Sequence, residues 1–100
     1  MKPLTWTKQS WETRILEIDC SRAVPTGATI SSVAAAMFDS VPADVSSTMI
    51  EGVPSISTTT VYVHVKAGTD GSNYNLRIRL TLSNGEHAED DITVYVRDIP

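Results

Sequence analysis

The feature that most constrains this chain is a strict alternation of apolar and polar residues in its second half. Three stretches carry it, and their apolar members are Val61, Val63 and Val65, then Leu76, Ile78, Leu80 and Leu82, then Ile92, Val94 and Val96. Successive side chains on a strand point to opposite faces, so each stretch would bury one face and expose the other. The pattern predicts three β-strands that share one core.

The first half carries weaker strand signals. Residues 13–20 (TRILEIDC) alternate apolar and acidic positions, which predicts a strand. Residues 29–38 (TISSVAAAMF) are rich in Ala, which favours a helix by propensity alone. Ser31 and Ser32 would interrupt the apolar stripe of such a helix, so we expect a strand here as well.

A further strand is predicted over residues 45–51, between Pro42 and a turn at Gly52-Val53-Pro54. Six or seven short strands separated by turn residues are typical of a β-sandwich. One hundred residues suit a single domain, so we expect one domain over 1–100, with 1–11 as a lead segment before the first strand.

Composition and charge limit the kinds of molecule that this chain is expected to bind and the compartment in which it is expected to be found. The formal net charge is -4 and the basic residues are scattered, which argues against binding to a nucleic-acid backbone. Cys20 is the single cysteine, so we expect no intrachain disulfide. No apolar run approaches the ~20 residues that span a bilayer. The first residues lack the apolar region of a secretory signal, so we expect the chain to stay in the cytoplasm where it is made.

The last hairpin can be predicted to the level of register. A two-residue Asn84-Gly85 turn would place apolar residues opposite outward-facing acids, so this register fails. A three-residue loop at 83–85 pairs Arg79 with Glu89 and Arg77 with Asp91, and places Gly85 in a left-handed conformation. A loop at 84–86 instead pairs Arg79 with Asp91. Both loops oppose cations and anions, and the sequence leaves the choice between them open.

Catalytic and metal-binding signals are weak. His87 lies among four acids (Glu86, Glu89, Asp90 and Asp91), but alternation places His87, Glu89 and Asp91 outward and Asp90 inward. We therefore expect an acidic hairpin that pairs with arginine and no metal site. No G-x-S-x-G sequence is present, and neither histidine stands in a loop suited to a base. We expect neither an enzyme nor a cofactor.

Trp6 and Trp11 stand in the polar lead segment. Tryptophan is enriched in the residues that dominate protein–protein binding, so both are candidate interface residues. The alternative is that they fold back as a lid on the open end of the sandwich.

The glycine-bearing stretch AGTDGSNY ends in a tyrosine after Asp70 and Gly71. Strand signals on both sides argue against a phosphate-binding loop, which would open a helix. The spacing from Asp70 to Tyr74 is similar to the tyrosine corner of immunoglobulin-type sandwiches. There, the Tyr74 hydroxyl would bond to upstream backbone, while Gly68 and Gly71 would supply unusual backbone angles.

The order of these features resembles a family of small tailed-phage and prophage virion proteins, the fibre-to-tail adaptors. KQSWETRILEIDCSRAVPTGATISSV resembles the family's opening, and TTTVYVHVKAGTDGSNYNLRIRLTLSNGEHAEDDITVYVRDI resembles its second half. Together they span about Lys8 to Ile99. Ser10 departs from a usual proline, and Cys20 from a frequent aromatic residue.

The resemblance implies an immunoglobulin-like antiparallel β-sandwich of about seven strands and a structural part of the virion at the tail or neck. It implies no catalytic residues. The expected partners are other tail, neck or fibre proteins and the chain itself, with assembly in the bacterial cytoplasm. The alternative hypothesis is a carbohydrate- or cell-surface-binding module that uses Tyr62, Tyr95 or the tryptophans as stacking platforms.

Overall fold

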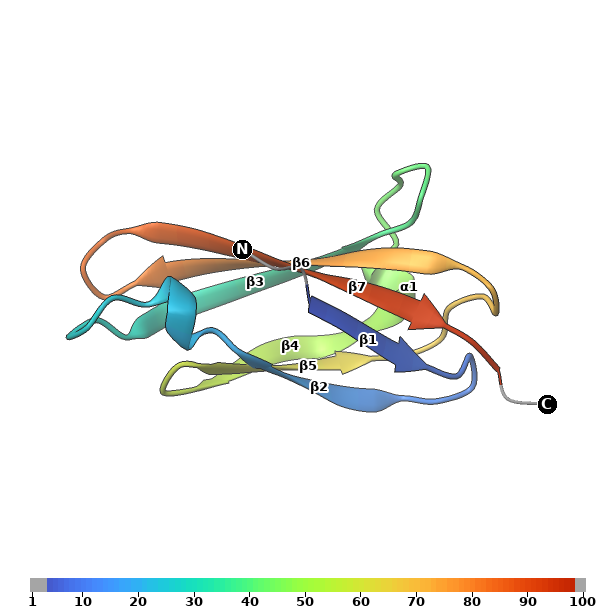
Figure 1. Cartoon of the computed structure of the whole chain (residues 1–100), viewed down its shortest axis with the longest axis horizontal. Helices are drawn as coiled ribbons and strands as arrows, with labels where there is room; N and C mark the ends of the chain where they lie inside the picture. The colour runs from blue at the N-terminus through green and yellow to red at the C-terminus, as the bar shows by residue number, and fades with distance from the viewer. Residues whose placement is uncertain (1–3, 99–100) are drawn as a thin grey trace.

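The structure is a computed structural model that describes residues 4–98, and it is a sandwich of two β-sheets (Figure 1). The described residues form seven strands: β1 (Leu4–Lys8), β2 (Arg14–Asp19), β3 (Ile30–Phe38), β4 (Ile50–Ser57), β5 (Thr60–Val65), β6 (Asn73–Leu82) and β7 (His87–Val96). A 3-10 turn, η1 (Ser21–Ala23), and a single helical turn, α1 (Ser46–Met49), complete the elements.

One sheet has the strand order β1-β7-β6-β3 and the other has β2-β5-β4. Only the β1–β7 pair among these ladders is parallel. In immunoglobulin letters the order is A-G-F-C against B-E-D, so the first strand lies on the side of the last. The all-β sandwich predicted from the sequence is confirmed.

The core forms where the inward faces of the two sheets meet. All ten alternating apolar residues of β5, β6 and β7 are buried, as the period-two pattern predicts. Leu16 and Ile18 of β2, and Met37 of β3, add to the same cluster. Burial of one apolar face from each sheet is the main favourable contribution to folding here.

The hairpin between β6 and β7 adopts the first of the two predicted registers. Arg79 lies opposite Glu89 and Arg77 opposite Asp91, which requires the three-residue loop at 83–85. Gly85 closes this loop with a φ of 89°, in the left-handed region that glycine adopts without steric cost. Charge matching across the outer face reduced the possibilities to two registers from sequence, and the structure selects the first of them.

The strand predicted over residues 45–51 is present only at its end, Ile50 and Glu51, and is wrong for residues 45–49. The Asp44 carboxylate accepts bonds from the Ser46 amide (2.9 Å) and the Ser46 hydroxyl (2.6 Å), which starts the helical turn α1 instead. Strand β4 then begins at Ile50 and continues through the expected turn at 52–54. Gly52, with a φ of 74°, lies where the pairing register with β5 shifts, so these residues form a bulge within the strand.

The lead segment is also different from the prediction. Residues 1–11 were expected to precede the first strand, but Leu4–Lys8 is itself a strand that pairs in parallel with β7. Thr5 and Thr7 are exposed while Trp6 and Lys8 turn inward, and the lysine hides this alternation in the sequence. Residues 1–3 lie outside the described part of the chain.

Candidate interaction site

The site is built at the end of the sandwich where β1 and β7 finish and where the loop from β5 crosses to β6. Tyr74 anchors this loop: its side chain is 9% exposed, and its hydroxyl accepts a hydrogen bond from the upstream Thr69 amide at 2.9 Å. Gly68 has a φ of 98°, and a Cβ there would lie 2.8 Å from a Val96 methyl group. The close packing requires glycine at this position.

Strand β7 is tied to the same loop by backbone and side chain. The Gly71 amide donates to the Val96 carbonyl at 2.8 Å, and the Val96 amide donates to the Ser72 carbonyl at 3.1 Å. The Asp70 carboxylate accepts from the Asp98 amide at 2.8 Å. The stretch that contains Asp70, Gly71 and Tyr74 thus turns a corner between sheets and binds the residues at the end of β7 and just after it. Its importance for stability remains a prediction.

Lys8 is a buried cation that sequence reasoning missed. Its side chain is 1% exposed, and its ammonium group donates to the carbonyls of Gln9 (2.6 Å) and Ala67 (2.5 Å). Burial lowers the pKa of Lys8, while the charges of Glu12 and Asp98 oppose that shift. Because Ala67 belongs to the corner loop, this lysine fastens β1 to the corner.

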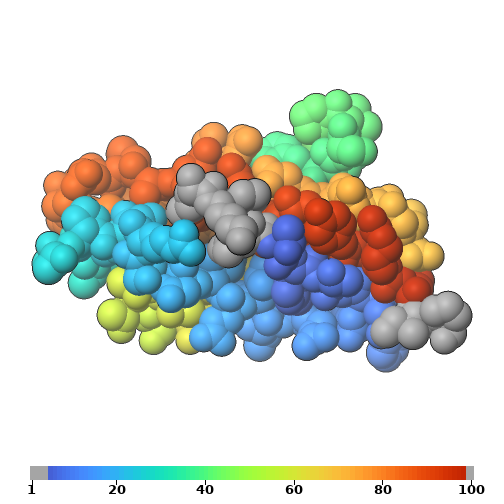
Figure 2. All heavy atoms as spheres, viewed as in Figure 1, coloured from blue at the N-terminus to red at the C-terminus, as the bar shows by residue number. Residues whose placement is uncertain are grey.

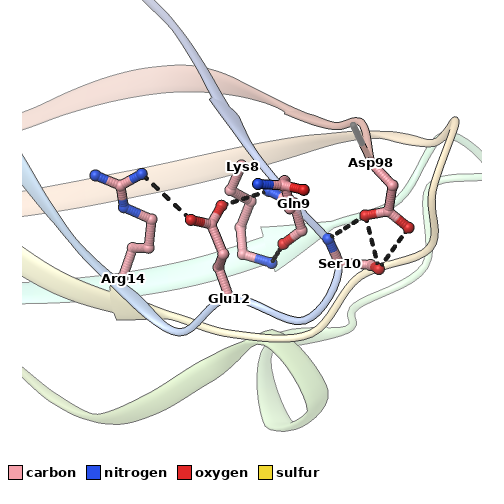
Figure 3. A network of polar contacts seen from close by, with 6 residues as sticks. All are labelled: Lys8, Gln9, Ser10, Glu12, Arg14 and Asp98. Carbon is pink, nitrogen blue, oxygen red and sulfur yellow. Dashed lines mark hydrogen bonds and ion pairs between the residues drawn. The ribbon is translucent and has the colours of Figure 1, made fainter. Parts of the chain in front are cut away.

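The turn that follows β1 is held on both sides (Figure 3). We call residues 9–12 the Trp11 turn. Within it, the Gln9 amide donates to the Glu12 carboxylate at 2.7 Å, and the Glu12 amide donates to the Gln9 carbonyl at 3.2 Å. The Ser10 amide (2.7 Å) and hydroxyl (2.8 and 2.9 Å) donate to the Asp98 carboxylate, which lowers the pKa of Asp98.

Trp11 itself is 94% exposed at the third position of this fastened turn. A tryptophan side chain buries a large apolar area when it finds a pocket, and leaving it in water forgoes that gain. The hydrogen bonds around Trp11 hold its backbone in place, so the exposed indole is presented on a rigid support. Such a support reduces the entropy that a binding partner must remove.

The two candidate tryptophans therefore do not share a surface. Trp6 is half-buried on β1 and packs against the hydrophobic core. It lines a shallow hollow of about 330 Å³ between β1 and β2, whose other walls include Leu16 and Ile18. Of the pair, only Trp11 stands free in solvent.

The tyrosines considered as sugar platforms also lie apart. Tyr62 is on β5 and Tyr95 is on β7, which belong to different sheets. Their neighbours Val61 and Val94 point inward, so the two rings lie on opposite outer faces of the sandwich. Tyr95 is covered in part by the Arg97 guanidinium, 5.5 Å from the ring centre.

The acidic hairpin is organised by arginine. Arg79 donates to Glu89 at 2.9 Å, and Arg77 lies 3.5 Å from Asp91. His87, Glu89 and Asp91 are exposed, whereas Asp90 is buried. Within residues 4–98, no group of three or more His, Cys, Asp or Glu side chains is arranged to hold a metal ion.

Asp90 is an unusual inward-pointing acid. Its side chain is 5% exposed, and one carboxylate oxygen has no hydrogen-bond partner among the described residues. Burial raises the pKa of Asp90, and a hydrogen bond with the Cys20 thiol partly opposes that shift. Burial also raises the pKa of Cys20 to about 12, so its thiol stays protonated and unreactive at neutral pH.

Comparison with known proteins finds a family that matches most of the chain. A family model described as "Podophage GP4 fiber-tail adaptor protein gp77" matches residues 8–95. No curated protein matches the chain. No helix within the described range is long and apolar enough to cross a membrane.

Proposed function

Because the chain belongs to the podophage GP4 fibre-tail adaptor family, and is thus a structural component of a phage tail, we propose that it joins fibre to tail purely through protein–protein contacts. In this proposal it carries out no catalysis, is assembled with the virion in the cytoplasm of the bacterial host, and has neighbouring tail, neck or fibre proteins as its partners. The features that support this proposal lie on the surface of the sandwich.

The observation that carries the proposal is Trp11 on its fastened turn. An indole that is 94% exposed adds nothing to the core of the free protein. The turn nevertheless holds it in one place with bonds from Ser10 and Gln9 to carboxylates. Fixed, exposed aromatic side chains are typical of the few residues that dominate a protein interface. We assign Trp11 as the anchor of the contact with a tail or fibre protein. Trp6, which lies on β1, is assigned to packing against the core.

The test is direct binding. The purified chain is titrated against the tail and fibre proteins encoded in the same phage genome, by calorimetry. We expect one of them to bind, and we expect Trp11→Ala to weaken that binding by about 30-fold or more, the effect of losing an anchor worth ~2 kcal/mol. The thermal unfolding of Trp11→Ala should match the original protein, because the side chain makes few contacts in the free chain.

The matched control is Val53→Ala. Val53 is another large apolar residue in solvent, 87% exposed on the bulge of β4. Its truncation should leave the affinity unchanged. Equal weakening by both variants would show that Trp11 is not a specific anchor. Binding of a host-surface polysaccharide in place of any tail or fibre protein would favour the carbohydrate-binding hypothesis and overturn the proposal.

A further inference from the structure

The two sheets have four edge strands, and three of them carry features that prevent pairing with other strands. Strand β2 bears charged side chains, β4 contains a proline within its bulge, and β1 ends in an inward-pointing lysine. Charges, prolines, bulges and inward lysines are the usual means of protecting a sheet edge. Strand β3 (ISSVAAAMF) has neither a charge nor a proline.

The backbone groups on the free edge of β3 can be identified from Met37. Its amide donates to the Ser46 hydroxyl at 2.9 Å and its carbonyl accepts from the Val45 amide at 2.8 Å, both on the side away from β6. Hydrogen-bonding directions alternate along a strand that pairs on one side. The amides and carbonyls of Val33 and Ala35 therefore also point away from β6, and the described residues provide no backbone partner for them.

The open part of this edge is short and bounded. At one end, a shift of register between Ile30 and Ser32 bulges the strand. At the other end, residues 44–46 cover the edge, through the bonds to Met37 and a bridge between Phe38 and Asp44. In Figures 1 and 2 the connection between β3 and α1, in green, stands out from the sandwich beyond this covered end. The free window is residues 31–35.

The side chains in this window leave room for a neighbouring backbone. Val33 and Ala35 pack against the core but are only half-buried. Ala34 is exposed and faces outward. It lies between two hollows, of about 530 and 270 Å³, and both hollows are lined by Ala34 and Arg79. A strand added here would complete the burial of Val33 and Ala35 without displacing a large side chain.

We propose that this window is a self-association surface, in which β3 pairs antiparallel with β3 of a second copy around a two-fold axis at Val33. The inference rests on the proposed function, since it supplies the contact between copies of an assembly protein. Charge is compatible with a second copy at this edge. Each copy has a net charge of -4, and strand β3 carries no charged residue, so two copies pair at this window without placing like charges opposite each other. An isologous contact is also the commonest form of self-association.

The register makes a specific prediction about opposing residues. With the axis at Val33, Ser32 of each copy lies opposite Ala34 of the other, on the outer face. Both side chains are exposed in the free chain, so both positions tolerate substitution. Ala34→Glu places a charge at the centre of the contact, while the double variant Ser32→Lys with Ala34→Glu places opposite charges against each other across the axis.

The experiment is sedimentation equilibrium of the full chain over a concentration series. We expect a monomer–dimer equilibrium that Ala34→Glu weakens by about tenfold or more, and that Ser32→Lys with Ala34→Glu restores. Hydrogen exchange of the Val33 and Ala35 amides should slow as the fraction of dimer increases with concentration. The control Ser55→Glu, on the exposed face of β4, should change nothing. Circular dichroism of each variant verifies that it is folded.

A monomer at every concentration would overturn the inference, as would an Ala34→Glu variant that associates as well as the original. If association returned when the charge at position 34 was removed but did not return in the double variant, the two-fold register would be wrong. These failures are distinct from failure of the proposed function. A chain that stays monomeric but binds a tail protein through Trp11 would contradict the pairing of β3 and leave the adaptor proposal intact.

Discussion

At the scale of single residues, the corner end of the molecule is held by buried polar groups that each have a backbone partner. The Tyr74 hydroxyl accepts from Thr69, and the Lys8 ammonium donates to Ala67 and Gln9. A buried polar group left without its partner costs more than the bond itself is worth. The corner should therefore be sensitive to the loss of a single atom.

Replacing Tyr74 with Phe tests this sensitivity. The Phe ring fills the same space, but the Thr69 amide loses the hydroxyl of the buried Tyr74 as its acceptor, so we expect a loss of ~1 kcal/mol or more of unfolding free energy. Urea unfolding measures it. Tyr62→Phe, on the outer face of β5, is the control and should have little effect. Equal stability of Tyr74→Phe and the original protein would contradict the assignment of a tyrosine corner.

Asp90 is the opposite case, a buried acid without a full set of partners. Its native pKa is raised above the ordinary 3.8, so the native state binds this proton more tightly than the unfolded state. The resulting stability is fully present below pH 3.8 and is lost as pH rises through the raised native pKa. We expect Asp90→Asn to add ~1 kcal/mol at pH 7 by removing the buried charge.

The pH dependence distinguishes this explanation from a simple packing effect. The gain from Asp90→Asn should shrink as the pH is lowered through the native pKa of Asp90, because the original side chain is then neutral as well. Asp91→Asn, one residue along on the outer face, should give no such gain. A stability difference that is constant from pH 3 to 7 would show that the charge of Asp90 is not the cause.

At the scale of elements, the strands with alternating apolar and polar residues could be predicted from the sequence. The elements that depend on specific side-chain contacts could not. Strands β5, β6 and β7 were predictable because each buries a continuous apolar face. The hairpin register was narrowed to two choices, which pair Arg79 with Glu89 or with Asp91, because its two strands are adjacent in the chain, and the structure adopts the first. The helical turn α1 depends instead on the bond that Ser46 donates to Asp44 and the bond that it accepts from the Met37 amide, which no periodic pattern reveals.

Strand β1 was missed for a related reason. Its inward positions are Trp6 and Lys8, and a lysine in the interior is excluded by ordinary patterning. The strand exists because β7 offers an edge and because the corner loop offers a carbonyl to the ammonium group. The candidate site was half predictable: Trp11 could be named from composition, but the turn that holds it relies on Asp98, which lies at the far end of the chain.

The fastening of β1 can be tested at Lys8. Lys8→Met keeps the length of the buried side chain but removes both hydrogen bonds to the Gln9 and Ala67 carbonyls, so we expect a loss of ~1–3 kcal/mol of unfolding free energy. Amide exchange along β1 should rise more than along β5, because β1 is attached to the corner through this residue. An unchanged exchange pattern would mean that pairing with β7 alone holds the strand. Thr7→Met, exposed on the same strand, is the control.

At the scale of the whole molecule, the two proposed contacts lie on opposite edges of one sheet. The Trp11 turn follows β1 and the neutral window belongs to β3, and the strand order places these at the two ends of the sheet. The sandwich is elongated, 46 × 23 × 23 Å. Pairing of two copies through β3 would therefore leave both Trp11 turns exposed, and the pair could engage two neighbours at once. Such bivalence strengthens attachment without any new contact surface.

Whether the chain joins fibre to tail can be read from the fibre content of purified virions. Particles are produced from the parent phage with the gene deleted and complemented in trans, and the ratio of fibre protein to major capsid protein is measured by quantitative mass spectrometry. We expect the ratio to fall to background without the chain, to return with the original sequence, and to stay low with Trp11→Ala. Particles that keep their full complement of fibres without the chain would contradict the proposed function.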